Sequence, residues 1–228
     1  MKLLVSPRSI EEAHQSLAAD IVDVKKPSEG SLGANFPWVI RSIKSLTTKP
    51  VSAAIGDFDY KPGGAALAAY GAACAGADYI KIGLMFNGGE QAREVIQAVV
   101  RAVKEEYPEK YVVVAAYADY VRLNTISPME VSALAAESGA DVAMTDTGLK
   151  DGRSAFEFMD EETFLAFTDK NRELGLKTAL AGGLQYEDIP ALMRIKPDII
   201  GVRGMVCGGD RNATIRGELV EKVLKMIR

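Results

Sequence analysis

The sequence predicts a single domain, residues 1–228, folded as a closed parallel (β/α)8 barrel of the TIM-barrel type. Three observations predict it: short apolar runs recur eight times, helical patterns lie between them, and the chain approaches the ~250 residues typical of such barrels. The runs are near-continuous rather than strictly alternating, as in parallel strands that helices cover. Successive units average about 28 residues, which favours a closed barrel.

Each predicted strand is a short run rich in Val, Ile, Leu or Ala. In chain order the runs are Leu3–Val5, Ile21–Val24, Val51–Ile55, Tyr79–Ile82, Tyr111–Ala116, Val142–Met144, Thr178–Ala181 and Ile199–Val202. Amphipathic helices are predicted at Glu90–Glu106, at Ser127–Ser138 and at Glu161–Leu174, the last ended by Gly175. An open doubly wound α/β sheet remains the alternative topology. No GxGxxG motif follows the first strand, so the usual dinucleotide-binding fingerprint is absent.

Charge and hydropathy limit the partners. The formal net charge is -4, which gives no electrostatic reason to expect nucleic acid or an anionic membrane. Near the start only Leu3, Leu4 and Val5 are consecutive apolar residues, too few for a signal peptide or a spanning helix. We therefore expect a cytoplasmic protein whose partner is a small-molecule substrate. The outer faces of the predicted helices do not indicate how many subunits associate, so the sequence leaves a homo-oligomer possible.

Few residues are suited to metal or redox chemistry. Cys74 and Cys207 lack the CxxC spacing of a zinc or redox site. The single histidine, His14, falls in Ser9–Leu17, which is typical of an amphipathic surface helix. The sequence thus predicts no metal and no cofactor. Proton transfer is left to carboxylates, lysines or tyrosines.

Charged residues occupy the ends of three predicted strands, where barrel enzymes place catalytic groups. The two-residue period puts Asp23 and Lys25 on the inner face of the second strand. Lys81 lies in the fourth strand, Asp146 ends the sixth, and Lys150 follows four residues later. A structural interpretation pairs Asp23 with Lys25 and Asp146 with Lys150 as ion pairs that close the barrel. We favour catalysis, because burying paired charges is often no more stable than burying apolar residues.

Clustered lysines have a chemical use. A free lysine with a pKa near 10.4 is only about 0.04% neutral at pH 7. A second ammonium about 6 Å away, at an effective dielectric near 20, contributes about 2.8 kcal/mol of repulsion, which lowers the pKa by about 2. A lysine tuned in this way attacks a carbonyl to form a Schiff base, and the iminium then serves as an electron sink.

Glycines cluster after the last two predicted strands, where barrels commonly bind phosphate. Their backbone N–H groups can approach a phosphate closely, and arginines add charge-assisted contacts. The candidate phosphate-binding residues are Gly182, Gly183, Arg203, Gly204, Gly208, Gly209 and Arg211. The expected ligand is a phosphorylated carbonyl compound.

Other residues carry weaker signals. Asp57, in a Gly-Asp-Phe-Asp segment, is expected to serve a turn or the start of a helix. Phe36 and Trp38, which flank Pro37, are expected in the core or in a hydrophobic staple. The long loop from Pro27 to Phe36 is a candidate lid.

Along essentially the whole chain, the sequence resembles the (5-formylfuran-3-yl)methyl phosphate synthases of methanofuran biosynthesis. The resemblance is carried by Asp23-Val24-Lys25, Glu29–Trp38, Gly76–Gly83, Asp146-Thr147 with Lys150-Asp151-Gly152, Leu180-Ala181-Gly182, and Gly201–Gly204 with Gly208–Arg211.

The resemblance implies a (β/α)8 enzyme that joins two molecules of glyceraldehyde 3-phosphate, with loss of phosphate and water, into a phosphorylated furan aldehyde. It implies that Lys25 is the reactive lysine and Asp23 its partner. The further catalytic residues it implies are Lys81, Lys150 and Asp146.

Without the resemblance, three interpretations stay open. A metal-free class I aldolase forms a covalent adduct with its substrate. A phosphate-binding decarboxylase that uses Asp-x-Lys electrostatics forms none. A phospho-ligand sensor built on a barrel binds triose phosphate without consuming it.

Overall fold

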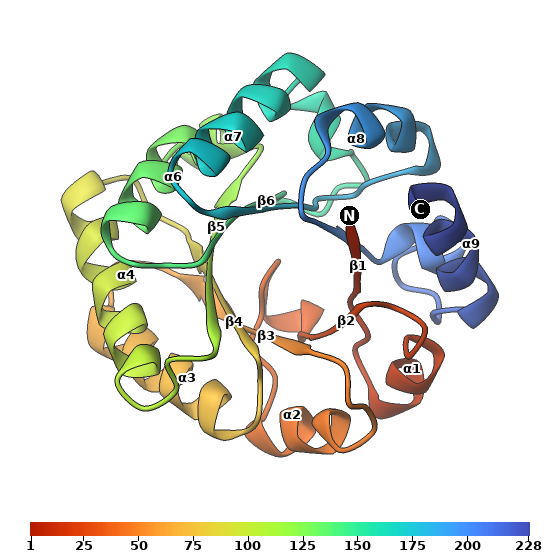
Figure 1. Ribbon diagram of the computed structural model, residues 1–228, viewed down its shortest axis with the longest axis horizontal. Coiled ribbons are helices and arrows are strands. Elements are labelled where there is room, and N and C mark those ends of the chain that lie inside the picture. The colour runs from red at the N-terminus through yellow and green to blue at the C-terminus, as the bar shows by residue number, and fades with distance from the viewer.

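Eight parallel strands close into a barrel in which β1 pairs with both β2 and β8 (Figure 1). The computed structural model describes all 228 residues. The strands are β1 (Lys2–Val5), β2 (Ile21–Val24), β3 (Val51–Phe58), β4 (Tyr79–Leu84), β5 (Tyr111–Tyr117), β6 (Val142–Asp146), β7 (Lys177–Leu180) and β8 (Ile199–Val202). Each lies where an apolar run predicted it. The (β/α)8 prediction is confirmed, and the open-sheet alternative is wrong because the sheet has no free edge.

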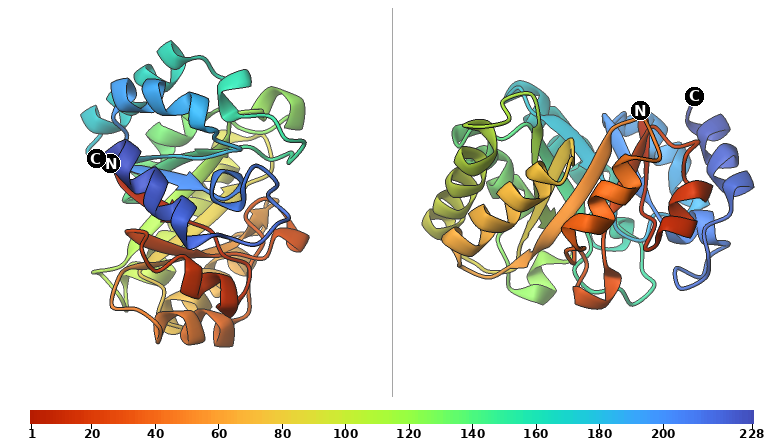
Figure 2. Two further views of the ribbon diagram at one scale, coloured as in Figure 1. Left: turned by 90° about the vertical axis from the view of Figure 1, so that its right-hand side faces the viewer. Right: turned by 90° about the horizontal axis from the view of Figure 1, so that it is seen from below.

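Helices form a ring around the strands, and the two chain ends lie near each other on one side of it (Figures 1 and 2). The α-helices are α1 (Ile10–Gln15), α2 (Pro37–Lys44), α3 (Pro62–Cys74), α4 (Gly89–Lys104), α5 (Tyr120–Leu123), α6 (Pro128–Glu137), α7 (Glu161–Glu173), α8 (Ile189–Ile195) and α9 (Gly217–Ile227). Short 3-10 helices span Pro27–Glu29, Ala155–Glu157, Tyr186–Asp188 and Gly204–Cys207. None of the helices combines the length and the hydropathy needed to span a bilayer.

The predicted helices start where capping chemistry places them. Ser127 accepts a hydrogen bond from the Glu130 amide at the start of α6, and Asp160 accepts one from the Thr163 amide at the start of α7. Such caps satisfy amides that have no partner within the helix. The helices predicted from periodicity are therefore confirmed to within two residues at either end.

Apolar side chains form two layers. A cluster of 55 buried residues fills the space between strands and helices, whereas a cluster of 12 fills the barrel interior. In β2, Val22 and Val24 belong to the outer layer and Ile21 to the inner one. The two-residue period then directs Asp23 and Lys25 inward, as the sequence predicted.

Strand β3 is longer than its apolar run. A bulge between Ala54 and Gly56, where Gly56 has φ +138°, shifts the register against β4 and lets the strand continue to Phe58. Asp57 therefore lies in a strand at the barrel mouth and pairs with Gly83 of β4. The expectation that Asp57 serves a turn or a helix start is wrong. Gly56 forms a β-bulge within the strand instead of a turn that ends it.

Phe36 and Trp38 are on the surface. Trp38 is 59% exposed and Phe36 44% exposed, and their rings stack with centroids 4.5 Å apart. Helix α2 buries Ile40 and Ile43 instead, which leaves its first turn facing outward. The expectation of a core or staple role is therefore wrong. His14 is exposed on α1, as expected.

Candidate active site

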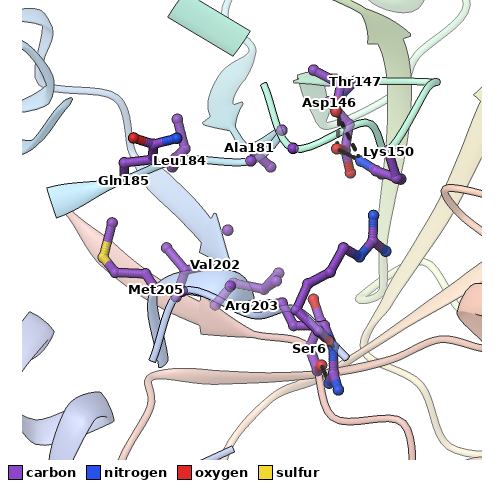
Figure 3. A pocket seen from close by; sticks show the side chains of 18 of the residues that line it. Ser6, Asp146, Thr147, Lys150, Ala181, Leu184, Gln185, Val202, Arg203 and Met205 are labelled. Atoms are coloured by element: carbon purple, nitrogen blue, oxygen red, sulfur yellow. Dashed lines mark hydrogen bonds and ion pairs between the residues drawn. The ribbon is translucent and has the colours of Figure 1, made fainter. Parts of the chain in front are cut away.

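A pocket of about 580 Å³ opens at the carboxyl ends of the strands. Figure 3 shows Asp146, Thr147 and Lys150 at one side of it, and Arg203 and Ser6 facing them from the ends of β8 and β1. Every predicted site residue except Asp23 lines this pocket: Lys25, Lys81, Asp146, Lys150, Gly182, Gly183, Arg203, Gly204, Gly208, Gly209 and Arg211. Asp23 is fully buried and contacts Lys81, which does line the pocket.

The deepest polar contact joins β2 to β4. Lys81 Nζ donates to both carboxylate oxygens of Asp23 at 2.9 Å, and Ser6 Oγ donates to Asp23 at 2.8 Å. Both charged side chains are almost completely buried. Burial acts to raise the pKa of Asp23, but the charges of Lys81 and Lys25 outweigh it and hold that pKa below its usual value. Asp23 is therefore an ionised carboxylate.

Between Asp23 and Lys81 lies β3, whose inward residues there are small. Ser52 of β3 pairs in register with Asp23 and with Tyr79, and Ala54 pairs with Lys81. Neither side chain is long enough to fill the space above it. The Lys81 side chain can therefore cross in front of β3 to reach Asp23.

The second carboxylate belongs to β6. Asp146 Oδ1 accepts a hydrogen bond of 2.5 Å from Lys150 Nζ, which also contacts Thr147 Oγ1 at 3.1 Å. Burial acts to raise the pKa of Asp146, but the charges of Lys150 and Lys25 lower it to about 2. At neutral pH Asp146 is thus an ionised carboxylate held by Lys150.

Lys25 is the lysine without a carboxylate partner. It is buried, and its Nζ takes part in no ion pair or hydrogen bond within the protein. Burial is the largest influence on it and lowers its pKa to about 8; the charge of Asp146 raises that pKa, and the charges of Lys150 and Lys81 lower it. About a tenth of Lys25 is then neutral at pH 7. The predicted direction is confirmed, but the main cause is burial rather than repulsion between ammonium groups.

The pairing also differs from the structural interpretation of the sequence. Asp146 does pair with Lys150, but Asp23 pairs with Lys81 and not with its strand neighbour Lys25. The three lysines and two carboxylates thus form two ion pairs and leave one free amino group in the pocket.

The glycine-rich loops after β7 and β8 offer backbone donors. Gly182 and Gly183 have φ values of +101° and +62°, and a Cβ at Gly183 would lie 2.4 Å from the Arg153 carbonyl oxygen. The N–H groups of Gly182, Gly183 and Gly204 donate to no acceptor in the protein. Those three amides can therefore bind an anion in the pocket without breaking an internal hydrogen bond.

The other predicted phosphate-binding residues differ in how free their donors are. The amides of Gly208 and Gly209 both donate to the carbonyl oxygen of Gly204, which closes the 3-10 turn. Arg211 is half-buried, makes no ion pair, and lies where the charge of Asp146 acts on its guanidinium. Arg211 is therefore an unpaired cation in the pocket.

Arg203 uses all its donors inside the protein. Its five N–H groups contact the Glu12 carboxylate twice, at 2.8 and 3.2 Å, and the carbonyl oxygens of Ser6, Arg211 and Ala213. Sequence reasoning missed Glu12, because an acidic residue in the first turn of a helix is common for dipole reasons alone. Its burial, at 3% exposed, is the signal that only the structure provides.

Fold and pocket together define the class of protein: a (β/α)8-barrel enzyme scaffold with a lysine- and carboxylate-lined mouth. The family model of 4-HFC-P synthase matches residues 3–224. The (5-formylfuran-3-yl)methyl phosphate synthase of Methanosarcina mazei is 60% identical, with 98% of each chain covered. That of Archaeoglobus fulgidus is 49% identical over 100% of this chain and 99% of its own. The chain belongs to the (5-formylfuran-3-yl)methyl phosphate synthase family.

Solved structures support the same fold. The chain resembles 3-hexulose-6-phosphate synthase with a TM-score of 0.71, 22% identity and full coverage of both chains. It resembles orotidine 5'-monophosphate decarboxylase from Methanocaldococcus jannaschii with a TM-score of 0.70 and 15% identity, covering 100% of this chain and 98% of the other. At these identities, the likeness concerns the barrel alone.

Proposed function

We propose that this protein condenses two molecules of glyceraldehyde 3-phosphate into (5-formylfuran-3-yl)methyl phosphate through a Schiff base on Lys25, and so acts as a carbon-oxygen lyase. The shared name of its relatives supports this product. Two triose phosphates contain the atoms of the product together with one phosphoric acid and two waters, so the reaction balances without an oxidant or a reductant.

The observation that carries the proposal is the free, buried amino group of Lys25. Its neutral form attacks the aldehyde carbon of one triose phosphate, and the carbinolamine loses water to give an iminium. The iminium withdraws electrons from the neighbouring carbon, which can then lose a proton and become the nucleophile for carbon–carbon bond formation. Water finally releases the product and restores the amine.

The two ion pairs supply proton transfer and charge. Lys150 and Asp146 line the pocket as an acid and a base in contact, suited to moving protons during aldol joining and dehydration. Lys81 and Asp23 lie deeper and keep a fixed positive group beside the reacting carbons. We propose all four as catalytic groups, with Lys25 as the covalent residue.

The phosphate groups are proposed to bind at the loops after β7 and β8. The amides of Gly182, Gly183 and Gly204 and the guanidinium of Arg211 are the free donors there. Gly208, Gly209 and Arg203 shape the same loop through internal hydrogen bonds. An unpaired arginine suits the phosphate that departs, because its positive charge stabilises the leaving anion.

Reductive trapping tests the covalent step. The protein is incubated with glyceraldehyde 3-phosphate and sodium borohydride, and intact mass reports the reduced adduct. We expect wild type to gain the adduct and Lys25→Ala to gain none. Lys26→Ala is the matched control, because Lys26 is the next residue, points away from the pocket and pairs with Glu29. Undiminished trapping in Lys25→Ala rejects Lys25 as the covalent residue.

Product analysis separates the remaining alternatives. Incubation with glyceraldehyde 3-phosphate alone is expected to give furan absorbance and free phosphate. A sensor would bind the triose phosphate and leave it unchanged. A decarboxylase would form no adduct that borohydride could reduce and trap. No added metal or nucleotide is expected to be needed, so activity that a chelator abolishes would contradict the scheme.

A further inference from the structure

The loop between β2 and α2 is closed by one internal hydrogen bond and anchored at two points across the barrel mouth. The Lys26 amide donates to the Gly33 carbonyl oxygen at 2.9 Å, and Ser31 Oγ donates to the Thr147 carbonyl oxygen at 2.8 Å. The Leu32 amide contacts both carboxylate oxygens of Asp57, at 3.0 and 3.2 Å. The last two contacts anchor the loop to β3 and to the end of β6.

Leu32 inserts into the barrel interior. Its side chain is fully buried and belongs to the 12-residue inner cluster. A Cβ at Gly83 of β4 would lie 2.9 Å from Leu32 Cδ1, so the fit there is close. The pocket has no lining residue from β3 or β5. Leu32 therefore occupies the mouth beside β3 and β5, and on this side only Lys81 of β4 reaches the pocket.

Asp57 holds this leucine in place and is itself held by Tyr117. The hydroxyl of Tyr117, a buried residue of β5, donates to Asp57 Oδ1. Burial, and next the charge of Asp57, raise the pKa of Tyr117 well above its usual value, so the phenol stays a donor. Gly30 completes the fit, because its φ is +133° and a Cβ there would lie 2.2 Å from Asp57 Oδ2.

The same loop begins next to the reactive lysine. The Lys26–Gly33 hydrogen bond closes the loop directly after Lys25. Thr147, on which Ser31 is anchored, follows Asp146, whose charge acts on Lys25. The loop thus starts next to Lys25 and is tied to the residue that follows Asp146.

We propose that residues 30–33 form a fixed plug over the β3 and β5 side of the barrel mouth. In this proposal Asp57 is the positioning residue that keeps the plug seated and limits the access of water to Lys25 from that side. Asp57 lines no part of the pocket, so it acts through the loop and not on the substrate. The kinetic part of the test rests on the proposed function, whereas the labelling part does not.

The test compares Asp57→Ala with Asp59→Ala. Asp59 lies two residues further on, is 64% exposed and pairs with Lys61, so its loss leaves the plug intact. Competitive acetylation across pH, followed by peptide mass analysis, gives the midpoint at which Lys25 becomes reactive in the protein without substrate. We expect Asp57→Ala to move this midpoint up by about one pH unit, or about tenfold less neutral amine at pH 7. Asp59→Ala should leave it unchanged.

Two further variants protect the test against misfolding of Asp57→Ala. Leu32→Ala removes the side chain of the plug and keeps the loop backbone, so we expect a shift in the same direction. Asp57→Asn retains an oxygen for the Leu32 amide, and we expect a smaller shift. The charges that act on Lys25, those of Asp146, Lys150, Lys81 and Asp23, are the same in every variant. Wild-type midpoints in Asp57→Ala and Leu32→Ala would overturn the proposal.

The kinetic readout is the pH profile of triose phosphate consumption. In Asp57→Ala we expect kcat at pH 7 to fall about tenfold while KM changes little, and activity to recover as the pH is raised. A purely structural role would instead lower the active fraction equally at every pH. If wild type consumes no triose phosphate, the proposed function is wrong. The labelling experiment still tests whether the plug affects Lys25.

Discussion

Lys81 donates to both oxygens of Asp23 at 2.9 Å, and this pairing leaves Lys25, the residue directly after β2, without a carboxylate partner. The pocket and its base hold three ammonium groups and two carboxylates. Deprotonation of one lysine makes this set of five groups neutral. The lysine without a salt bridge loses the least electrostatic stabilisation when it gives up its proton. The geometry thus selects Lys25 from three chemically equal residues.

The first prediction concerns the buried pair itself. Asp23→Asn leaves the Lys81 ammonium buried without an opposite charge, which typically costs about 3–5 kcal/mol. We expect the free energy of unfolding, from urea denaturation followed by circular dichroism, to fall by about that amount. Asp59→Asn breaks the exposed pair with Lys61 and should cost less than about 1 kcal/mol. Equal denaturation midpoints for Asp23→Asn and wild type would show that the pair is not buried as described.

The second prediction concerns Glu12, which holds the loop after β8 through Arg203. Glu12→Gln removes a charge-assisted contact worth about 1.5–3 kcal/mol and loosens the segment that carries Arg211. We expect KM for glyceraldehyde 3-phosphate to rise about tenfold or more, with kcat nearly unchanged, since the lysines stay in place.

Glu11→Gln is the matched control for that experiment. Glu11 is the preceding residue of α1 and is exposed, so its substitution should leave both kinetic constants at wild-type values. A variant Glu12→Gln with wild-type KM would refute the bracing role of Glu12. Loss of kcat alone would place the effect at the lysines instead of the phosphate loop.

The third prediction is the pH dependence of adduct formation. Only neutral Lys25 attacks the carbonyl, and its pKa of about 8 means that the neutral fraction grows about tenfold per pH unit below 8 and levels off above it. The initial rate of borohydride trapping should follow this curve. A rate that still rises tenfold per unit near pH 9.5 would indicate an ordinary exposed lysine.

Much of the fold and the position of the charged groups followed from the sequence. Near-continuous apolar runs located all eight strands, and the two-residue period placed Asp23 and Lys25 on one inward face. Because parallel strands bring their carboxyl ends to the same edge, Lys81, Asp146 and Lys150 were expected in the same mouth, and the pocket does contain them.

Contacts between distant segments were not predictable in the same way. Periodicity gives the face on which a residue lies, but not which neighbour it reaches across the barrel. Only the structure therefore shows that Asp23 pairs with Lys81 and not with Lys25. The Glu12–Arg203 contact spans 191 residues and has no local signal. Asp57 was wrongly predicted to lie in a turn, because a glycine such as Gly56 is equally typical of a turn and of a β-bulge.

The last prediction follows from the free-energy cost of burying the protonated amino group of Lys25. A lysine with a pKa of about 8 when folded and about 10.4 when unfolded binds fewer protons in the folded state between those two values. Unfolding free energy therefore rises with pH across that window, and below about pH 8 the full cost of about 3 kcal/mol remains. Lys25→Met removes the charge and keeps the length, so at pH 7 it should be more stable than wild type by about that amount. The gain should shrink above pH 8 and vanish near pH 10.4. Lys26→Met, which alters a partly exposed lysine, should show no such gain in urea denaturation at any of these pH values. A Lys25→Met protein no more stable than wild type at pH 7 would mean that burying the charge of Lys25 costs no stability.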